Sequence, residues 1–338
     1  MEQLSQSPHL RALLTPVRTT WPFPQLARLW RQIMRRQEGE RYLQRKYERI
    51  HNKPLNLTAP QTYTEKLFWR MITWNRGDMP VRFMQLTDKY AVRDYVAARV
   101  GERHLVKLLW QGIDPRAIPF DRLPNQYVIK PNHASGRVLV VSGHANRPEI
   151  IRTVSSWLAK NYYWAAREYQ YYHIEPRIMI EEYLHDHDGT PPFDYKIHCF
   201  NGAPEHILVR DHRHDICPYF DTTWRHLDFS DKVDAVQPWV PKPANLDEML
   251  SLARTLSEGF GYVRVDLYNV QRRVYFGELT FTPASGNLIY KPESWDLRHG
   301  RKWDLSLDVE PTLALTDKSS RFSPEAVLSR QPSCVEAR

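Results

Sequence analysis

The chain has 338 residues, of which 42% are hydrophobic, so it is long enough to form two or three packed lobes. We find no transmembrane run and no signal peptide, and the three cysteines (Cys199, Cys217 and Cys334) lack CxxC spacing, which favours a reducing, cytoplasmic location. The net charge of +8 suits an acidic partner such as a nucleotide, a glycan or an anionic lipid, whereas no nucleic-acid-binding motif is present.

The N-terminal part is expected to become helical after a short irregular segment. Residues 1–25 are dotted with proline and are expected to be poorly ordered. Residues 26–50 are typical of a helix, with apolar positions such as Leu26, Leu29 and Ile33 among many arginines. Such a basic helix can rest peripherally on an anionic membrane, but packing on the body of the protein is the favoured alternative.

Two further helices are predicted over residues 63–74 and 88–100. Thr64 is expected to cap the first helix, and Asp88 or the residue before it the second. The second helix would then carry Lys89 in its first turn, where helix N–H groups and a lysine can meet the same phosphate.

Residues 104–184 are predicted to form a small lobe of strands with a helix at about 147–161. A hydrophobic strand in this lobe ends at Lys130, and a buried lysine there requires an anionic partner, for which we expect phosphate. The loop from Asn132 to Gly136 is small enough for its N–H groups to approach such a phosphate. It is not a P-loop, because the GxxxxGK[ST] order is absent.

Two later strands carry charged residues. The strand RIMIEEYL contains Glu181 and Glu182 near its end, where a carboxylate and backbone groups can bind an adenine amine. The strand DYKIHCFNG opens with Asp194 and Lys196 on one face. Each feature alone is typical of a solvated strand end, but their order along the chain favours a nucleotide site. A larger lobe follows from residue 192, with a helix predicted at 245–259.

The strands RVDLY and GELTFTPASGN each carry one acid, Asp266 and Glu278. Paired buried carboxylates repel, and a hard cation such as Mg²⁺ relieves the repulsion. The two acids face each other only if the hairpin loop between them has an odd number of residues. Alternation then places Arg264 and Thr280 on the same face, which suits phosphate chemistry. The alternative is a buried salt bridge within the sheet.

In this order the segments resemble the ATP-grasp superfamily, and in detail the TupA-like ATP-grasp proteins of teichuronopeptide and surface-polysaccharide biosynthesis. The resemblance runs from TEKLFW (64–69) to RKWDL (301–305). It implies an α+β ATP-grasp fold, in which two α+β lobes clasp ATP beside an N-terminal helical region. The implied organisation is a poorly ordered N-terminus (1–25), an N-terminal helical region (26–103), a small lobe (104–191), a large lobe with the metal site (192–310) and a C-terminal tail (311–338).

The resemblance also implies which residues bind ATP and Mg²⁺. One departure concerns the metal motif, which in the superfamily often ends in Glu-x-Asn. Here a threonine, whose hydroxyl is a weaker and shorter ligand than an amide oxygen, takes the last position and leaves a second Mg²⁺ ion in doubt. The implied ligands of ATP are Lys89, Lys130, His133, Ser135, Gly136, Glu181, Glu182, Leu184 and Lys196; those of Mg²⁺ are Asp266, Glu278 and Thr280; the catalytic residues are Arg264 and Lys196.

The implied activity is that of a carboxylate–amine ligase acting on a surface polysaccharide or its precursor. A carboxylate attacks the γ-phosphate of ATP, and an amine then displaces phosphate from the acyl phosphate, leaving ADP. The expected partners are a carboxylate-bearing glycan or peptide acceptor and an amine donor. The alternatives are an ATP-grasp kinase, a non-catalytic nucleotide-binding scaffold, and a glycosyltransferase of the same pathway, for which the only Asp-x-Asp motif begins at Asp186.

Two other clusters are better explained without a ligand. One is a set of histidines and aspartates whose spacing is too permissive for zinc: His198, His206, Asp211, His212, His214 and Asp215. The other is an aromatic group that can stack on sugars but more commonly fills a core: Tyr162, Tyr163, Trp164, Tyr169, Tyr171 and Tyr172.

Overall fold

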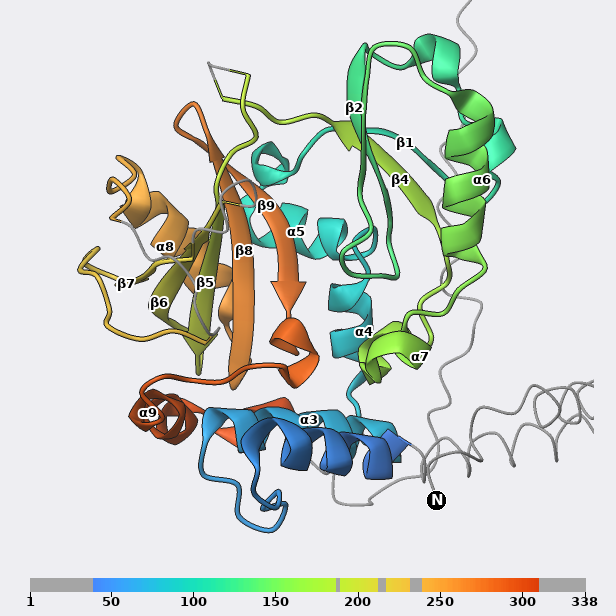
Figure 1. Ribbon diagram of the computed structural model, residues 1–338. Helices are drawn as coiled ribbons and strands as arrows, with labels where there is room; N and C mark the ends of the chain where they lie inside the picture. The colour runs from blue at the N-terminus through green and yellow to red at the C-terminus, as the bar shows by residue number, and fades with distance from the viewer. Residues whose placement is uncertain (1–38, 187–188, 212–216, 232–238, 310–338) are drawn as a thin grey trace, which may run out of the picture.

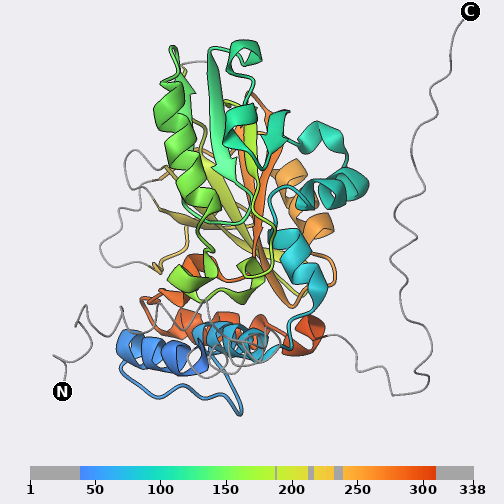
Figure 2. The same cartoon turned by 90° about the vertical axis from the view of Figure 1, so that its right-hand side faces the viewer.

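A computed structural model describes residues 39–186, 189–211, 217–231 and 239–309. Two antiparallel sheets and a set of helices make up this part of the chain, which confirms the α+β prediction (Figure 1). Helix 39–51, α3 and α9 form a layer below the two sheets in both views (Figure 1, Figure 2). Within the described residues, no helix combines the length and the apolar character needed to cross a membrane.

The first helices are close to those predicted, but two of their starts differ. Helix 39–51 is the second half of the predicted helix at 26–50, and residues 26–38 lie outside the described residues. Helix α3 (Tyr63–Arg76) is capped by Thr62, not Thr64, because Thr62 forms a capping box with Glu65. The Thr64 hydroxyl instead donates to Asp296 Oδ2 at 2.6 Å.

Helix α4 spans Val81–Thr87 and α5 spans Val92–Val100, so the predicted start of the latter at residue 88 was wrong. Asp88 Oδ1 accepts hydrogen bonds from the N–H groups of Tyr90 and Ala91, at 2.8 and 3.3 Å. This side-chain turn competes with helix formation, and Lys89 therefore lies in a turn before the helix.

The smaller sheet has the strand order β1-β4-β2-β3. Its strands are β1 (Leu108–Gly112), β2 (Gln126–Pro131), β3 (Leu139–Ser142) and β4 (Ile178–Glu182). Helix α6 (Arg147–Leu158) lies along one face, where its Ile150 and Val154 join a core with Ile129 and Ile180. The short helix α7 (Tyr163–Ala166) follows.

The larger sheet has the order β7-β6-β5-β8-β9. Its strands are β5 (Asp194–Phe200), β6 (Ala203–Arg210), β7 (Tyr219–Asp221), β8 (Tyr262–Val270) and β9 (Arg273–Thr280). Helix α8 (Leu246–Ser257) covers one face, where Met249 and Ala253 pack in a core with Ile197 and Val265. Because α8 buries that face, alternate residues of β5, β8 and β9 are left to form a polar site on the other.

Helix α9 (Ser294–Lys302) packs against α3 below this sheet. The remaining elements are short 3₁₀ helices: η2 (Glu102–His104), η3 (Pro115–Ala117), η4 (Phe120–Arg122), η5 (Tyr169–Tyr171), η6 (Pro283–Gly286) and η7 (Leu305–Asp308).

The hairpin between β8 and β9 pairs the two acids by an unforeseen route. Its turn has two residues, Gln271 and Arg272, both with positive φ (51° and 67°), so the odd-numbered loop that strand alternation alone would require is not present. A bulge at Gly277 adds one unpaired residue to β9. The number of residues between the two acids is therefore odd, and Asp266 lies opposite Glu278. A Cβ atom on Gly277 would come within 3.0 Å of the Asp266 carbonyl oxygen, which explains the glycine.

Candidate active site

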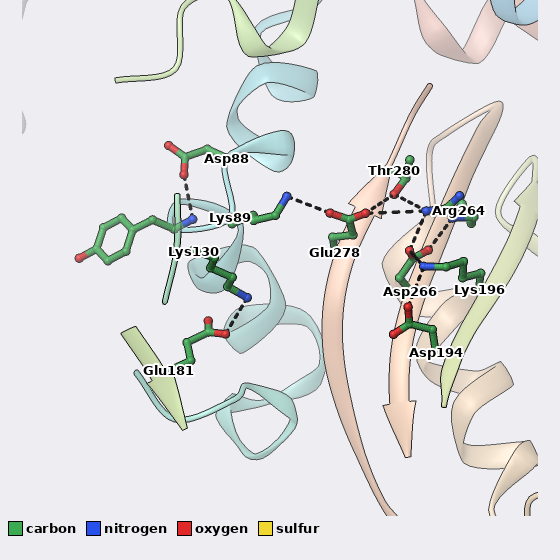
Figure 3. Close-up of polar contacts among 11 residues, drawn as sticks. Asp88, Lys89, Lys130, Glu181, Asp194, Lys196, Arg264, Asp266, Glu278 and Thr280 are labelled. Carbon is green, nitrogen blue, oxygen red and sulfur yellow. Dashed lines mark hydrogen bonds and ion pairs between the residues drawn. The ribbon is translucent and has the colours of Figure 1, made fainter. Parts of the chain in front are cut away.

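Arg264 is the centre of the polar face of the larger sheet. Its Nε and Nη2 donate to the two carboxylate oxygens of Asp266 at 2.6 and 2.7 Å, and Nη2 also donates to Thr280 Oγ1 at 3.1 Å. The same Nη2 lies 3.7 Å from Glu278 Oε1 (Figure 3). The cross-strand pairs Arg264–Thr280 and Asp266–Glu278 thus confirm that these four side chains share one face.

Two lysines complete this group of charges. Lys196, opposite Asp266 on β5, places Nζ 2.7 Å from Asp266 Oδ2 and 3.3 Å from Asp194 Oδ2. Lys89 reaches Glu278 Oε2 at 2.9 Å from the other side (Figure 3). Burial alone would raise the pKa of Glu278, but Lys89, Lys196 and Arg264 together hold it well below its ordinary value.

Three carboxylates and three cations therefore balance one another on this face. The geometry also satisfies the buried salt-bridge alternative, because each acid already has a cationic partner. A metal ion bound by Asp266 and Glu278 would have to displace part of this network. We expect Lys89 to be the most readily displaced cation, since it comes from a turn outside the sheet and, of the three carboxylates on this face, pairs with Glu278 only.

Lys130 and Glu181 form a second charged group, on the smaller sheet. Lys130 Nζ lies 2.6 Å from Glu181 Oε2, and Arg93 Nη1 lies 3.3 Å from Glu181 Oε1. The anionic partner of Lys130 in this structure is Glu181 on the adjacent strand β4, and the expected contact of Lys130 with phosphate stays a prediction. The predicted adenine ligand Glu181 is buried between two cations.

The loop after β2 is held by Asn132, which is 1% exposed. Its side-chain N–H₂ donates to Asp88 Oδ1 and to the Glu175 carbonyl, both at 3.0 Å. Its main-chain carbonyl oxygen accepts from the Lys89 N–H at 3.2 Å, which ties this loop to the turn that carries Lys89. Ser135 is partly exposed and Gly136, with a φ of 69°, is exposed, so both are accessible to a ligand.

His133 does not join them at the surface. Its Nδ1 lies 3.1 Å from Asn132 Oδ1 and its Nε2 lies 3.2 Å from the Trp157 carbonyl of α6. Burial lowers its pKa. We therefore assign the His133 side chain to support of the loop, in place of its predicted contact with a nucleotide.

The predicted adenine segment lies at the end of β4. The Glu182 side chain is exposed, its N–H donates to the Lys107 carbonyl at 3.0 Å, and Leu184 is half-buried. The Asp-x-Asp motif that begins at Asp186 extends into residues 187–188, which lie outside the described residues.

Glu168 is a buried acid that the sequence analysis missed. It accepts hydrogen bonds from the hydroxyls of Thr282 and Ser285, the latter at 2.8 Å. Burial raises its pKa to about 7, and the charge of Lys46 opposes the shift. Its position within a run of aromatic residues was the sequence signal that could have indicated a buried acid. Lys46 was missed although it lies on the apolar face of its helix, beside Leu43 and Tyr47.

The histidine and aromatic clusters lie largely in the core. The His206 ring stacks between His198 and His299, with centroid distances of 4.2 and 4.4 Å, and burial lowers the pKa of all three. His212, His214 and Asp215 lie outside the described residues. Tyr163 is fully buried among its aromatic neighbours, which agrees with the core interpretation for that residue.

A family model described as TupA-like ATPgrasp matches residues 65–303. Among solved structures, a D-alanine–D-alanine ligase from Bacillus anthracis complexed with ATP is 15% identical (TM-score 0.40; 66% of this chain and 63% of that chain). A phosphoribosylamine–glycine ligase from Thermotoga maritima is 14% identical (TM-score 0.38; 62% and 52%). The chain thus spans less than two thirds of either structure. A search of curated proteins finds no match.

Proposed function

Because the chain belongs to the TupA-like ATP-grasp family, we propose that it is an ATP-dependent carboxylate–amine ligase that uses Mg²⁺ and releases ADP and phosphate. Its acceptor would be a carboxylate on a surface polysaccharide or its precursor, and its second substrate an amine. The observation that carries the proposal is the polar face on which Arg264, Asp266, Glu278 and Thr280 meet with two lysines.

The donor atoms on this face fit a magnesium ion. Mg²⁺ prefers oxygen ligands and commonly uses one or two carboxylates, with phosphates and water completing its shell. Asp266 and Glu278 would hold the ion, and the Thr280 hydroxyl, 3.0 Å from Glu278 Oε1, would orient a water molecule. When bound, the ion neutralises charge on the β- and γ-phosphates.

The cations that now pair with these acids suit phosphoryl transfer. Arg264, Lys196 and Lys89 would stabilise the charge on the phosphoryl group that moves from ATP to the acceptor carboxylate. Lys130 and the loop at Ser135 and Gly136 would bind the other phosphates and shield the acyl phosphate from water. The amine then attacks the acyl carbon, and phosphate leaves.

An ATP-grasp kinase is the second candidate, because it shares every nucleotide contact and differs only in the acceptor. The absence of an amine requirement would identify it. A glycosyltransferase is less well supported, since Asp186, the one described residue of the Asp-x-Asp motif, accepts a hydrogen bond from the Gln271 N–H in the β8–β9 turn.

A nucleotide product assay tests the proposal. The protein is incubated with ATP, Mg²⁺ and pairs of acidic sugars or peptides with amines, and nucleotides are separated by chromatography. We expect ADP and phosphate only when both substrates are present. ADP with a stable phosphorylated product and no amine would indicate a kinase, and AMP with pyrophosphate would refute the acyl-phosphate mechanism.

A further inference from the structure

The pairing of Lys89 with Glu278 connects the two sheets. Lys89 lies in the turn before α5, and its N–H donates to the main-chain carbonyl oxygen of Asn132, which directly follows β2 of the smaller sheet. Its side chain extends to β9 of the larger sheet, where Nζ donates to Glu278 Oε2 at 2.9 Å (Figure 3). The main chain of Lys89 is thus bonded to the predicted phosphate loop, while its charge lies against a proposed metal ligand.

This contact occupies one of the two oxygens of Glu278. Its Oε1 accepts from the Thr280 hydroxyl at 3.0 Å and lies 3.7 Å from Arg264 Nη2, whereas Oε2 is the atom that meets Lys89. A metal ion bound through Oε2 has to replace the Lys89 ammonium group, because the two positive charges would repel each other at this distance. Lys89 therefore competes with a metal ion for this carboxylate.

The charges on the polar face favour Lys89 in this competition when no nucleotide is bound. The three carboxylates and three cations of the face balance one another. A divalent ion would add positive charge to this balanced group, so we expect it to bind weakly. A triphosphate changes the balance, because it brings negative charge that both the metal ion and Lys89 can meet. The flexible stem of a lysine lets the ammonium group move while the main chain stays in place.

Asn132 fixes the main chain about which Lys89 would move. It is 1% exposed, its N–H donates to the Arg177 carbonyl oxygen at 3.0 Å, and its side-chain oxygen accepts from the Arg177 N–H at 2.8 Å. Its side-chain N–H₂ donates at 3.0 Å to Asp88 Oδ1, which also accepts from two N–H groups of the turn. Asn132 thereby holds the turn that carries Lys89 against the start of the phosphate loop and the segment before β4.

We infer that Lys89 keeps a metal ion off Glu278 until nucleotide phosphates draw its ammonium group away, and that Asn132 is the positioning residue that holds the turn of Lys89 beside the phosphate loop for this exchange. The inference rests on the proposed function and adds an order of binding, in which the nucleotide arrives before the metal ion or together with it. Such coupling is reciprocal, so the metal ion should also favour binding of the nucleotide.

Electron paramagnetic resonance of Mn²⁺ with the full-length protein, without nucleotide, tests the exchange as a gain of affinity. Wild type should bind Mn²⁺ weakly. Lys89→Met should bind Mn²⁺ at least about tenfold more tightly, the scale of one competing charge-assisted hydrogen bond. Adding Glu278→Gln to Lys89→Met should abolish this gain. Lys242→Met, which removes an exposed lysine, is the matched charge control and should bind like wild type.

Asn132→Ala and Asp88→Ala test the positioning role with the same measurement. Each removes the hydrogen bond between these two side chains, so Lys89 is held less firmly at Glu278. The Mn²⁺ affinity of both variants should lie between those of wild type and Lys89→Met. Asp88→Asn is the conservative control, because asparagine keeps a side-chain oxygen that accepts the same bonds, and it should bind like wild type. A purely structural role of Asn132 would lower stability without raising the affinity for Mn²⁺.

Several outcomes would overturn the inference in variants with wild-type circular dichroism. They are tight Mn²⁺ binding by wild type without nucleotide, an unchanged affinity of Lys89→Met, and a gain that survives Glu278→Gln. An equal gain in Lys242→Met would also overturn it, as general surface charge. Unchanged affinity in both Asn132→Ala and Asp88→Ala, or a gain in Asp88→Asn, would overturn the positioning role of Asn132.

The result is separable from the proposed function. A gain in Lys89→Met that depends on Glu278, without ADP release by wild type for any amine, would support the exchange and contradict the ligase. ADP release by wild type, together with an unchanged Mn²⁺ affinity of Lys89→Met, would support the ligase and overturn the exchange.

Discussion

The ammonium group of Lys130 lies 2.6 Å from Glu181 Oε2, so a phosphate arriving at this lysine must compete with a carboxylate already in place. Arg93 also contacts Glu181, at 3.3 Å, and would keep this carboxylate paired when Lys130 turns towards a nucleotide. Lys130 can therefore change its partner from Glu181 to a phosphate without leaving a buried charge unpaired.

We predict that Lys130→Met weakens binding of a non-hydrolysable ATP analogue by about 1–3 kcal/mol, the value of a charge-assisted hydrogen bond. Lys242→Met is the control, since Lys242 is exposed. Titration calorimetry measures both. Equal affinities for Lys130→Met and wild type would remove Lys130 from the nucleotide site.

Glu168 should make the stability of the protein depend on pH. Burial raises its pKa from 4.5 to about 7, so the folded protein binds this proton more tightly than the unfolded chain does. Its contribution to the free energy of unfolding is therefore full below about pH 4.5 and is lost as the pH rises through about 7. At about 1.4 kcal/mol per pH unit, the loss is about 3 kcal/mol.

Urea unfolding across this pH range, for wild type and Glu168→Gln, checks the prediction. Glutamine has no proton to lose and can keep hydrogen bonds with Thr282 and Ser285. The difference between the two proteins should therefore change with pH in favour of the variant at higher pH. Parallel stability profiles would show that Glu168 is ionised throughout.

The β8–β9 hairpin explains how the two acids come together. The strands themselves were predictable, because their branched and aromatic residues alternate with polar ones. The bulge at Gly277 was not predictable. The length of the turn and the presence of a bulge together decide which residues pair, and the same pairing can arise from different combinations of the two. The α5 start was missed for a related reason, since the Asp88 side chain forms a local turn that helix periodicity does not reveal.

The two-residue turn offers a test of this hairpin. Gln271 and Arg272 both have positive φ, which asparagine and glycine adopt more readily. The double variant Gln271→Asn, Arg272→Gly should raise the free energy of unfolding by up to about 1 kcal/mol and leave ADP formation unchanged. Gly277→Ala is the contrasting variant, because its Cβ would crowd Asp266, and it should lower activity. A destabilised double variant would contradict the assigned turn.

Contacts between distant parts of the chain join residues that are far apart in the sequence. Lys46 Nζ donates to the Ser285 carbonyl oxygen at 2.5 Å, and the active-site candidate pairs Lys89 with Glu278. Spacing along a sequence does not encode such contacts, which explains why the pairing of Lys130 with Glu181 went unseen.

Arg70 connects the helical layer to the larger sheet through buried polar contacts. This buried side chain of α3 donates to the carbonyls of Phe281 and Tyr262, at 2.8 and 3.0 Å, and pairs with Asp308 at 2.6 Å. Arg70→Met should lower the free energy of unfolding by about 3–5 kcal/mol, because it leaves Asp308 buried and unpaired.

Arg76→Met on the same helix is the matched control. Its pair with Glu40 is exposed, and its loss should lower the free energy of unfolding by at most about 1 kcal/mol. Urea denaturation gives both free energies of unfolding. Equal decreases for the two variants would show that the buried contacts of Arg70 do not stabilise the packing of the helical layer on the larger sheet.

In the proposed mechanism, Asp266 and Glu278 hold a metal ion together with ATP. Electron paramagnetic resonance with Mn²⁺, a substitute for Mg²⁺ that also prefers oxygen ligands, tests it most directly. Wild type should bind Mn²⁺ tightly only with a non-hydrolysable ATP analogue present. Glu278→Gln should keep its fold and most of its nucleotide affinity but lose this Mn²⁺ signal and all turnover. Undiminished binding of the Mn²⁺–nucleotide complex by Glu278→Gln would contradict the metal site and the mechanism built on it.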